Sequence, residues 1–267
     1  MNKSGNFFAG KLKYTDLHIR KPLLPALDSR IADEECRIST KNLHCFASGD
    51  ARCNEQPGLT AMHTLWLREH NRIARRLSRL NQHWSDDRWI NLISQIMLIH
   101  AYIWQCSANI FSLLFSCNFN CRVYYETRKI VGAMLQHITY NEWLPIILGP
   151  RVLEIFELKL MATGFYNDYN DTVNPTVSNA FAAAAFRFGH SLVKNTISRC
   201  SKQFSEVPFF IKLHKELNNP SNLHNFGSVD RLMFGLIHQK IARRDEFIAS
   251  ELTNHLFQVN QSYVVIC

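Results

Sequence analysis

Apolar residues recur at helical spacing in five stretches of this 267-residue chain. After Pro57, a run of apolar side chains with arginines between them predicts a helix over 57–82. Its members are Leu59, Met62, Trp66, Ile73, Leu77 and Leu80. A second helix is expected over 123–142, ending before Pro145 because proline lacks the N–H that continues a helix. The same spacing predicts helices over 178–199, 228–242 and 244–257.

Two of these expected helices have a well-defined apolar face. In 178–199 the stripe consists of Phe181, Ala185, Phe188 and Leu192, and in 228–242 it consists of Val229, Leu232, Met233, Leu236 and Ile237. Residues 1–50, which contain Pro22 and Pro25, favour extended or irregular structure. No stretch alternates between apolar and polar residues as a half-buried strand does. The pattern therefore predicts a mainly α fold with little or no sheet.

One segment interrupts this pattern. From Trp89 to Cys121 the chain has no Asp, Glu, Lys or Arg. A run of this length suits a membrane span, and residues 90–116 are one hypothesis for an anchor. Asn91, Gln95 and His100 lie within it, and polar side chains are unfavourable in lipid. We therefore favour an insert without membrane contact over a membrane span.

The chain is basic, with a net charge of +8 and an isoelectric point of about 9.1. The basic residues are scattered or lie beside acidic ones, as in Arg68-Glu69. The sequence has no zinc-finger spacing, aromatic RNA-binding motif or glycine-rich phosphate loop. We therefore expect no nucleic-acid partner.

Eight cysteines in a chain of this length do not define a dense disulfide framework. Cys36 and Cys45 lie close in sequence among polar residues, and they are candidates for closing a small loop. Triplets of the N-glycosylation type begin at Asn2, Asn170 and Asn260. The first residues lack the continuous apolar stretch of a signal peptide.

Four blocks of sequence resemble the animal haem peroxidase superfamily, which includes peroxidasins, chorion peroxidases, myeloperoxidase and thyroid peroxidase. The first block is 49–60 (GDARCNEQPGLT), followed by Met62-His63-Thr64 and 67–71 (LREHN). The others begin at Lys129 (KIVGAM, then ITYNEWLP), at Tyr169 (YND, then NAF and AFRFGHSL) and at Leu217 (LNNP, continuing to DEF at 245–247). The blocks follow the order of the family, so the chain is expected to form the central part of the animal haem peroxidase fold.

The resemblance implies a site built around haem b, in which His190 is the axial ligand of the iron. Gly189 beside it leaves room for a flat macrocycle, and Arg187 is placed to pair with a haem propionate. The residues alone left alternatives open: His190 as a core histidine and Arg187 as a solvated arginine. Arg52 matches the arginine that stabilises charge on a breaking peroxide bond.

Glu55 matches the carboxylate that forms an ester with a haem methyl in family members. Gln56 stands where a few mammalian members carry a methionine linked to haem, so no such link is expected. Cys53 is expected to be a small buried residue. His63, His70 and His137 are interpreted as structural, because a spacing of seven places His63 and His70 two helical turns apart.

The sequence lacks the Asp-His-Asp motif that supplies the family's distal acid–base histidine, and it lacks the family's calcium-binding loop. The asparagine that accepts from the axial histidine belongs to a further segment not found here. The resemblance implies oxidation of an unidentified electron donor by hydrogen peroxide. The alternative is a non-catalytic truncated fragment or mis-predicted gene product. For the intact protein we expect an extracellular or secretory location.

The resemblance also bears on the uncharged segment. Deleting residues 89–122 joins Asp86-Asp87-Arg88 to Val123-Tyr124, as in family members. We therefore expect a partial peroxidase domain over 1–258, an insert at 89–122 and a non-family tail at 259–267. A retained intron, translated in frame, is the hypothesis for the insert, since codons for Arg88-Trp89 and Cys121-Arg122 can hold splice-site dinucleotides.

Overall fold

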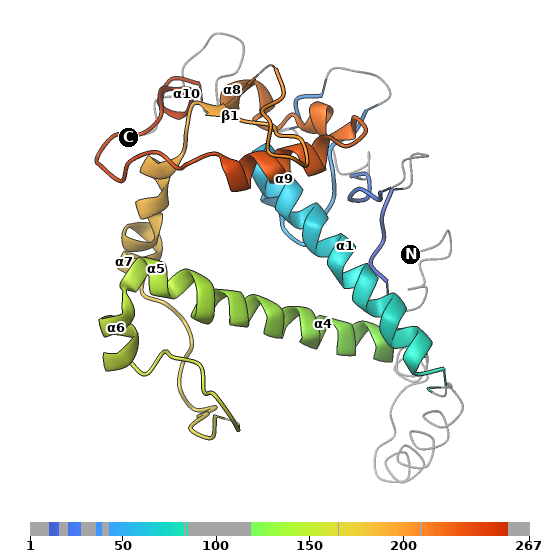
Figure 1. Ribbon diagram of the computed structural model, residues 1–267, viewed down its shortest axis with the longest axis vertical. Helices are drawn as coiled ribbons and strands as arrows, with labels where there is room; N and C mark the ends of the chain where they lie inside the picture. Colours follow the sequence, from blue (N-terminus) through green and yellow to red (C-terminus); the bar gives the residue numbers. More distant parts are fainter. Residues whose placement is uncertain are drawn as a thin grey trace, which may run out of the picture. The chain divides into compact units, whose positions relative to one another are not determined.

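The computed structural model describes residues 11–15, 21–27, 36–38, 43–82, 84, 119–164, 166–208 and 210–255 (Figure 1). These residues are mainly helical, which confirms the predicted fold class. Residues 89–118 of the expected insert, the hypothetical membrane segment at 90–116 and the tail at 259–267 lie outside the described residues. Within the described ranges, no helix combines the length and the apolar character needed to cross a membrane.

The chain divides into two compact units, and α1 (Pro57–Leu80) runs from one into the other. Unit 1 comprises Met1–Lys13 and Trp66–Asn170, and unit 2 comprises Tyr14–Leu65 and Asp171–Cys267. Unit 1 holds α4 (Phe119–Ile138), the π-helix η2 (Thr139–Trp143), α5 (Leu144–Leu148) and α6 (Pro150–Ile155). Unit 2 holds the 3₁₀-helices η1 (Ala51–Asn54), η3 (Ala185–Leu192) and η4 (Pro220–His224), together with α7 (Asn179–Ala183), α8 (Leu213–Glu216), α9 (Ser228–His238), α10 (Ser250–Thr253), β1 (Thr196–Ile197) and β2 (Ile211–Lys212).

In unit 1 the helical path does not end before Pro145, contrary to the sequence prediction. A π-turn over Thr139–Trp143 shifts the hydrogen-bond register, so that the backbone N–H of Leu144 donates to the carbonyl of Thr139. Pro145 thereby falls in the first turn of α5, where its missing N–H leaves no helical bond unmade. The helical segment continues to Leu148.

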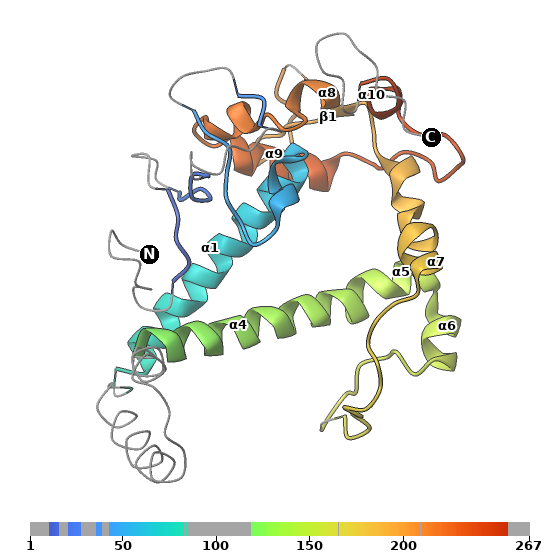
Figure 2. The same cartoon turned by 180° about the vertical axis from the view of Figure 1, so that it is seen from behind.

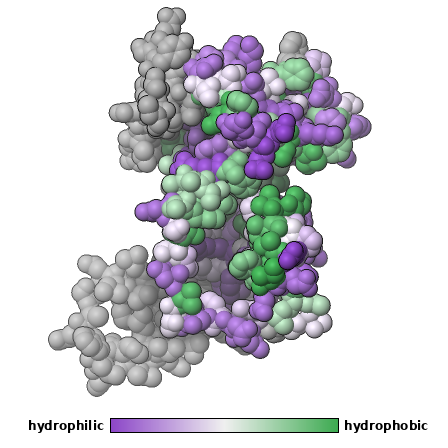
Figure 3. All heavy atoms as spheres, turned by 90° about the vertical axis from the view of Figure 1, so that its left-hand side faces the viewer, coloured by the Kyte–Doolittle hydropathy of each residue, from purple (hydrophilic) through white to green (hydrophobic). Residues whose placement is uncertain are grey.

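The described residues of α4, α5 and α6 in unit 1 leave much apolar surface exposed. Among the described side chains of α4, those of Val123 and Thr127 are buried. Large apolar side chains of the following two helices are exposed: Ile146, Ile147, Leu148 and Ile155. Figure 3 shows apolar side chains open at the surface on one face of the molecule. α1 makes contacts within this unit: the His70 ring lies 5.4 Å from that of Tyr124 at the start of α4, and Asn71 Oδ1 accepts from the backbone N–H of Leu12 at 2.7 Å.

Among the described residues, unit 2 contains most of the buried apolar side chains. β1 and β2 pair antiparallel, with Ile197 opposite Ile211, and α9 packs on β1 while α8 follows β2 directly (Figures 1 and 2). The buried apolar residues around them are Ile197, Cys200, Ile211, Leu213, Leu217, Leu223, Val229 and Leu232. The approach of α9 to the strand requires Gly235, because a Cβ there would lie 1.8 Å from the carbonyl oxygen of Ser198.

Described segments from the first fifty residues, such as 21–27 and 43–50, complete this core without forming regular strands. Phe46 is 1% exposed, and Asn54 bonds both its N–H and its carbonyl through the side-chain amide. Ala26 and Phe46 form an isolated antiparallel bridge. Cys36 and Cys45 are joined in a disulfide, which confirms the small loop predicted from their spacing.

The buried face of α1 differs from the predicted apolar stripe. Thr60, Thr64, Leu67, Asn71 and Ala74 are buried, whereas Met62 and Leu80 are exposed. The hydroxyl of Thr60 donates to the carbonyl of Cys53 at 2.5 Å, and that of Thr64 donates to the carbonyl of Thr60. Polar side chains lie on the buried face because each finds a partner there. Apolar spacing predicted the helix, and Ile73 of that run is buried, but the polar part of the buried face has no signal in such a pattern.

The helices expected at 178–199 and 244–257 are shorter and broken. The first becomes α7 and η3, and its end forms β1; the second is reduced to the four residues of α10. Neither α7 nor η3 has a buried residue. Because an amphipathic helix depends on packing of its apolar face, the stripe that begins at Phe181 does not sustain one continuous helix here. The helix expected at 228–242 ends at His238.

Candidate functional site

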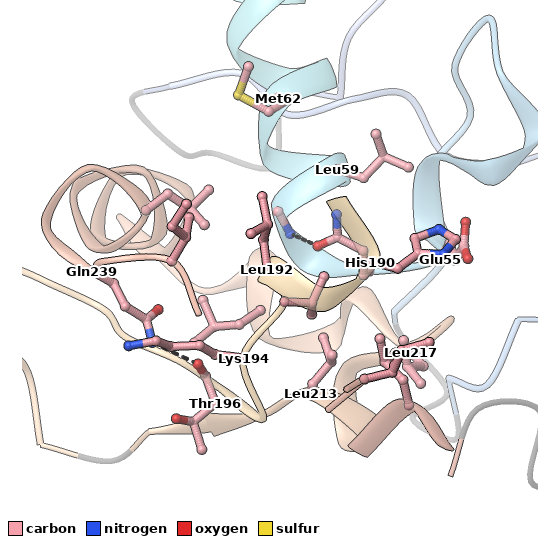
Figure 4. A pocket seen from close by; sticks show the side chains of 18 of the residues that line it. Glu55, Leu59, Met62, His190, Leu192, Lys194, Thr196, Leu213, Leu217 and Gln239 are labelled. Carbon is pink, nitrogen blue, oxygen red and sulfur yellow. Dashed lines mark hydrogen bonds between the residues drawn. The ribbon is translucent and has the colours of Figure 1, made fainter. Parts of the chain in front are cut away.

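A cavity of about 800 Å³ lies within unit 2 (Figure 4). Its walls come from the segment before α1 and the first turns of that helix, the end of η3, β1, α8, the end of α9 and α10. Ligand sites span roughly 300–1,000 Å³, so the cavity has the size of a site for a large cofactor. Most of the lining is apolar and includes Leu59, Met62, Leu192, Val193, Ile197, Leu213, Leu217, Leu236, Ile241, Ile248 and Leu252.

His190 lines this cavity from η3 (Figure 4). The end of η3 is fixed by the following chain: Leu192 accepts from the backbone N–H of Ala242 at 3.0 Å, and the Ser191 hydroxyl accepts from that of Asp245. The histidine is exposed, and a Cβ at Gly189 beside it would meet no atom within 4 Å. His190 is therefore open to a ligand, which argues against its interpretation as a packed core histidine.

Glu55 lines the same cavity, directly after η1 (Figure 4). Its backbone N–H donates to the carbonyl of Arg52 at 2.9 Å, and its carbonyl accepts from the backbone N–H of Asn218 at 3.2 Å. Asn218 has φ of +53°, in the left-handed region that asparagine tolerates better than most residues. The fold thus brings Glu55 and His190, far apart in sequence, to one cavity.

Polar side chains on the remaining wall are few. Lys194 and Lys240 both line the cavity and supply positive charge. Gln239 is held by its amide, which donates to the carbonyl of Thr196 at 2.9 Å and accepts from the N–H of Ser198. Gln56 lines the cavity as well, and its Oε1 accepts from the N–H of Gly58 at 2.7 Å. An apolar site with an imidazole, a carboxylate and two ammonium groups suits an apolar cofactor that carries acid groups.

Arg52 lies in η1, three residues before Glu55, but its side chain does not line the cavity. It is 75% exposed and forms a two-pronged pair with Asp50, from Nε at 3.0 Å and from Nη2 at 2.8 Å. These hydrogen bonds from Arg52 lower the pKa of Asp50 far below its usual range. The guanidinium is thus held by a neighbouring carboxylate in this conformation.

Arg187 also lies away from the cavity lining. Its side chain is exposed, and its Nε donates to the carbonyl of Ala182 at 3.3 Å. Of the four residues selected from the sequence, the fold therefore brings two together at the cavity, His190 and Glu55. The roles of Arg52 and Arg187 stay predictions.

The other residues singled out from the sequence have local contacts. Cys53 is buried, as expected, with Sγ 3.2 Å from the carbonyl of Phe46. The ring of His70 packs against Tyr124, and His137 is exposed on α4 beside Asn141. Among the described residues, a cluster suited to a metal ion contains none of His63, His70 and His137.

Sequence reasoning missed the part of the cavity wall between Leu236 and Thr253. This segment had been assigned to two amphipathic helices, but it forms the end of α9, an irregular stretch and α10. The signal that could have shown this is local: Lys240 to Arg244 place three cations within five residues. Such a charge cluster does not favour a helix face packed in a core.

Comparisons with known proteins identify the family of this chain. The sequence profile of the family "Animal haem peroxidase" matches residues 2–91 and 120–265. The chain is 38% identical over 242 residues to the peroxidasin homolog of Mus musculus, covering 90% of this chain and 14% of that protein. Human thyroid peroxidase is 37% identical over 222 residues, which cover 82% of this chain and 20% of that protein. The chain thus spans only a small part of the length of these relatives.

A solved structure gives the same result at the level of the fold. Peroxidase A from Dictyostelium discoideum superposes with a TM-score of 0.65 at 27% sequence identity, covering 95% of this chain and 40% of that chain. The profile leaves out 92–119, within the expected insert, and includes 259–265, within the expected tail; both divisions stay predictions. Because the profile matches most of the residues of this chain, the chain belongs to the animal haem peroxidase family.

Proposed function

We propose that this chain binds haem b in the cavity of unit 2, with His190 as the axial ligand of the iron. The observation that carries the proposal is the presence of His190 and Glu55 on the wall of one large apolar cavity. The family supports haem as the cofactor. The two residues lie in separate matched blocks of the sequence, so neither motif alone predicts that both line the same cavity.

The cavity fits the cofactor in three respects. Within the described part of the chain, no hydrogen bond engages the imidazole of His190, so a ring nitrogen is available to the iron. The walls at Leu59, Met62 and Leu192 are apolar, as the face of a porphyrin requires. Lys194 and Lys240 are placed to pair with the propionates, in addition to the predicted partner Arg187.

Bound haem supplies the redox chemistry by which hydrogen peroxide oxidises an electron donor. Toward that chemistry, His190 would hold the iron through a neutral imidazole nitrogen, and Glu55 would be the carboxylate available for an ester link. Arg52 is the predicted cation for stabilising charge on the peroxide, and reaching the cavity requires it to leave Asp50. Arginine stays protonated at any accessible pH, so it cannot transfer the proton between the peroxide oxygens.

Peroxidase activity of the intact protein, with an electron donor as its second substrate, follows from the family as a proposal. The second candidate is a haem-binding segment without turnover of its own. The observation that favours it is the sequence itself, in which no Asp-His-Asp motif occurs. Removing a general acid–base residue typically lowers a rate about 10²–10⁴-fold.

An extracellular or secretory location is part of the same proposal. The disulfide between Cys36 and Cys45 supports it, because such bonds persist in oxidising compartments. The glycosylation triplet at Asn170 lies at an exposed position, as an acceptor site requires. We propose no nucleic-acid or membrane partner.

Haem titration of the purified chain tests the cofactor site. The expected result is a saturable Soret absorbance band at one haem per chain, and His190→Ala should remove it. His137→Ala is the matched control, because His137 is exposed on α4 in unit 1 and should leave the titration unchanged. A band of equal intensity and affinity in His190→Ala would contradict the assignment.

The same preparation tests turnover. With guaiacol and hydrogen peroxide, we expect no rate above that of free haem, and acid–organic extraction should release all of the haem because no ester forms at Glu55. A rate well above the free-haem control would mean that another residue supplies the distal base. His44, His63, His70 and His137 would then be replaced one at a time.

A further inference from the structure

A second group of ligating side chains lies in unit 2, on residues that do not line the cavity. His214 belongs to α8, Glu251 belongs to α10, and His255 follows α10 by two residues. One potential ligand atom from each of the three lies within 4.8 Å of the other two. All three residues are half-buried, so an ion placed between them is reachable from solvent but partly shielded from it.

The three side chains already face one another. Nδ1 of His214 is hydrogen-bonded to Oε2 of Glu251, which also accepts from the backbone N–H of His214 at 3.1 Å. The imidazole of His255 lies beside that of His214, with ring centroids 4.5 Å apart. Two imidazoles and a carboxylate thus converge from α8, from α10 and from the turn that follows α10, and the two helices are in contact.

One residue fixes the backbones that carry two of these ligands. The carbonyl of Asn195 accepts from the N–H of Leu213 at 3.0 Å, at the start of α8. The side-chain Oδ1 of Asn195 accepts from the N–H of Glu251 at 3.0 Å and from the Ser250 hydroxyl at 3.2 Å, at the start of α10. Because α8 and α10 are held by the same residue, His214 and Glu251 are positioned before any ion binds.

We propose that His214, Glu251 and His255 form a binding site for a divalent transition-metal ion of the zinc class. Two imidazole nitrogens and one carboxylate oxygen are a common zinc ligand set, and such a set leaves a coordination position for water. Nitrogen ligands favour Zn²⁺ over Mg²⁺ and Ca²⁺, which bind oxygen. The ligand atoms lie within 4.8 Å of one another, and binding one ion at about 2.0–2.2 Å would require the three side chains to rotate toward it.

The consequence of this site is structural. α10 has only four residues, and two of them, Leu252 and Thr253, line the cavity. An ion bound by Glu251, His255 and His214 would link α10 to α8, which carries the cavity residue Leu213. Two elements of the cavity wall would then be held together. The site does not involve haem, so its test uses the haem-free chain.

Zinc binding is measured by calorimetric titration of the full chain after treatment with a chelator. The expected result is one Zn²⁺ per chain and a Tm that rises by several degrees at saturation. His255→Ala should weaken zinc binding at least about tenfold and remove the rise in Tm. His137→Ala, a change of the same type at an exposed position outside the cluster, should leave both quantities unchanged.

Two further measurements make the outcome decisive. His255→Ala and Glu251→Gln should melt at the wild-type temperature in the presence of chelator, which separates loss of the ion from loss of the fold. The X-ray absorption spectrum of the zinc-loaded chain should show nitrogen and oxygen neighbours with the imidazole pattern. Unchanged zinc affinity in both variants, no binding in the wild type, or sulfur neighbours around the zinc would overturn the proposal.

Discussion

The helices of the two units differ in how far their side chains are buried. In unit 2, short helices and a two-residue strand pair surround a core that includes Phe46, Leu223 and Leu232, each at most 1% exposed. In unit 1, α4 is twenty residues long, yet along its described side chains only Val123 and Thr127 are buried. The spacing that predicts a long helix such as α4 lies within one segment of sequence, whereas the position of a site residue depends on contacts between distant segments.

The two proposed binding sites are not shared equally between the units. The cavity with His190 and Glu55, and the cluster of His214, Glu251 and His255, both lie in unit 2. They are built from short elements that packing holds in place. Substitutions in the two units should therefore differ in size, and in one case in sign.

The largest difference is expected between two leucines. Leu232 is 0% exposed in the core of unit 2, and Leu232→Ala should lower the free energy of unfolding by about 2–5 kcal/mol. Leu135 on α4 is 43% exposed, and Leu135→Ala should change it by less than about 1 kcal/mol. Urea unfolding followed by circular dichroism measures both. Equal losses would show that α4 is packed as tightly as α9.

Two glycines should give effects of opposite sign. At Gly235 an added Cβ meets the backbone of Ser198 at 1.8 Å, so Gly235→Ala should destabilise by about 1–3 kcal/mol. At Gly132, in the middle of α4, a Cβ meets no atom within 4 Å. Gly132→Ala should therefore stabilise by about 0.5–1 kcal/mol, because alanine is the better helix former. The Tm of each variant provides the check, and a stabilising Gly235→Ala would show that α9 does not approach β1 so closely.

The smallest effect concerns pH. His224 stacks on Phe46 with ring centroids 4.7 Å apart, and burial lowers its pKa against the opposing hydrogen bond to the carbonyl of His44. Burial, together with the nearby His224, also lowers the pKa of His44. As pH falls through the ordinary histidine pKa of about 6.5, the unfolded chain therefore takes up more protons than the folded one. Stability conferred by the neutral rings is present above that pH and is lost below it.

The measurement is the fall in Tm between pH 7.5 and pH 5.5. His224→Gln keeps a side-chain N–H for the carbonyl of His44 but does not titrate, so it should reduce this fall. His137→Gln, at an exposed position in unit 1, should leave the fall as in the wild type. An identical fall in all three proteins would exclude the buried pair as its source.

Much of this picture could be predicted from the sequence. The helical class, the extent of α1 and the disulfide followed from periodicity and spacing. Motifs selected His190 and Glu55, which both line the cavity, while their roles stay predictions. The buried face of α1 did not, because Thr60 and Thr64 are buried through hydrogen bonds to backbone carbonyls that a hydropathy pattern cannot show. Arg52 and Arg187 were selected by motif, but the direction of a long side chain depends on its partners, here Asp50 and the carbonyl of Ala182.

The tertiary contacts of unit 2 could not be predicted either, because they join residues that are distant in sequence. His214 and Glu251 are far apart in sequence, and they meet because Asn195 holds the starts of both α8 and α10. Likewise, the predicted helix over 178–199 gave way to β1, since Ile197 finds Ile211 across the strand pair. No local pattern identifies partners of this kind.

The central claim, that His190 is the iron ligand in the cavity of unit 2, is tested most directly by resonance Raman spectroscopy of the reduced, haem-loaded chain. We predict an iron–histidine stretching band that shifts with ¹⁵N-labelled histidine, disappears in His190→Gly and returns when imidazole is added to that variant. A band of unchanged frequency and intensity in His190→Gly without imidazole would show that another residue holds the iron and would contradict the account.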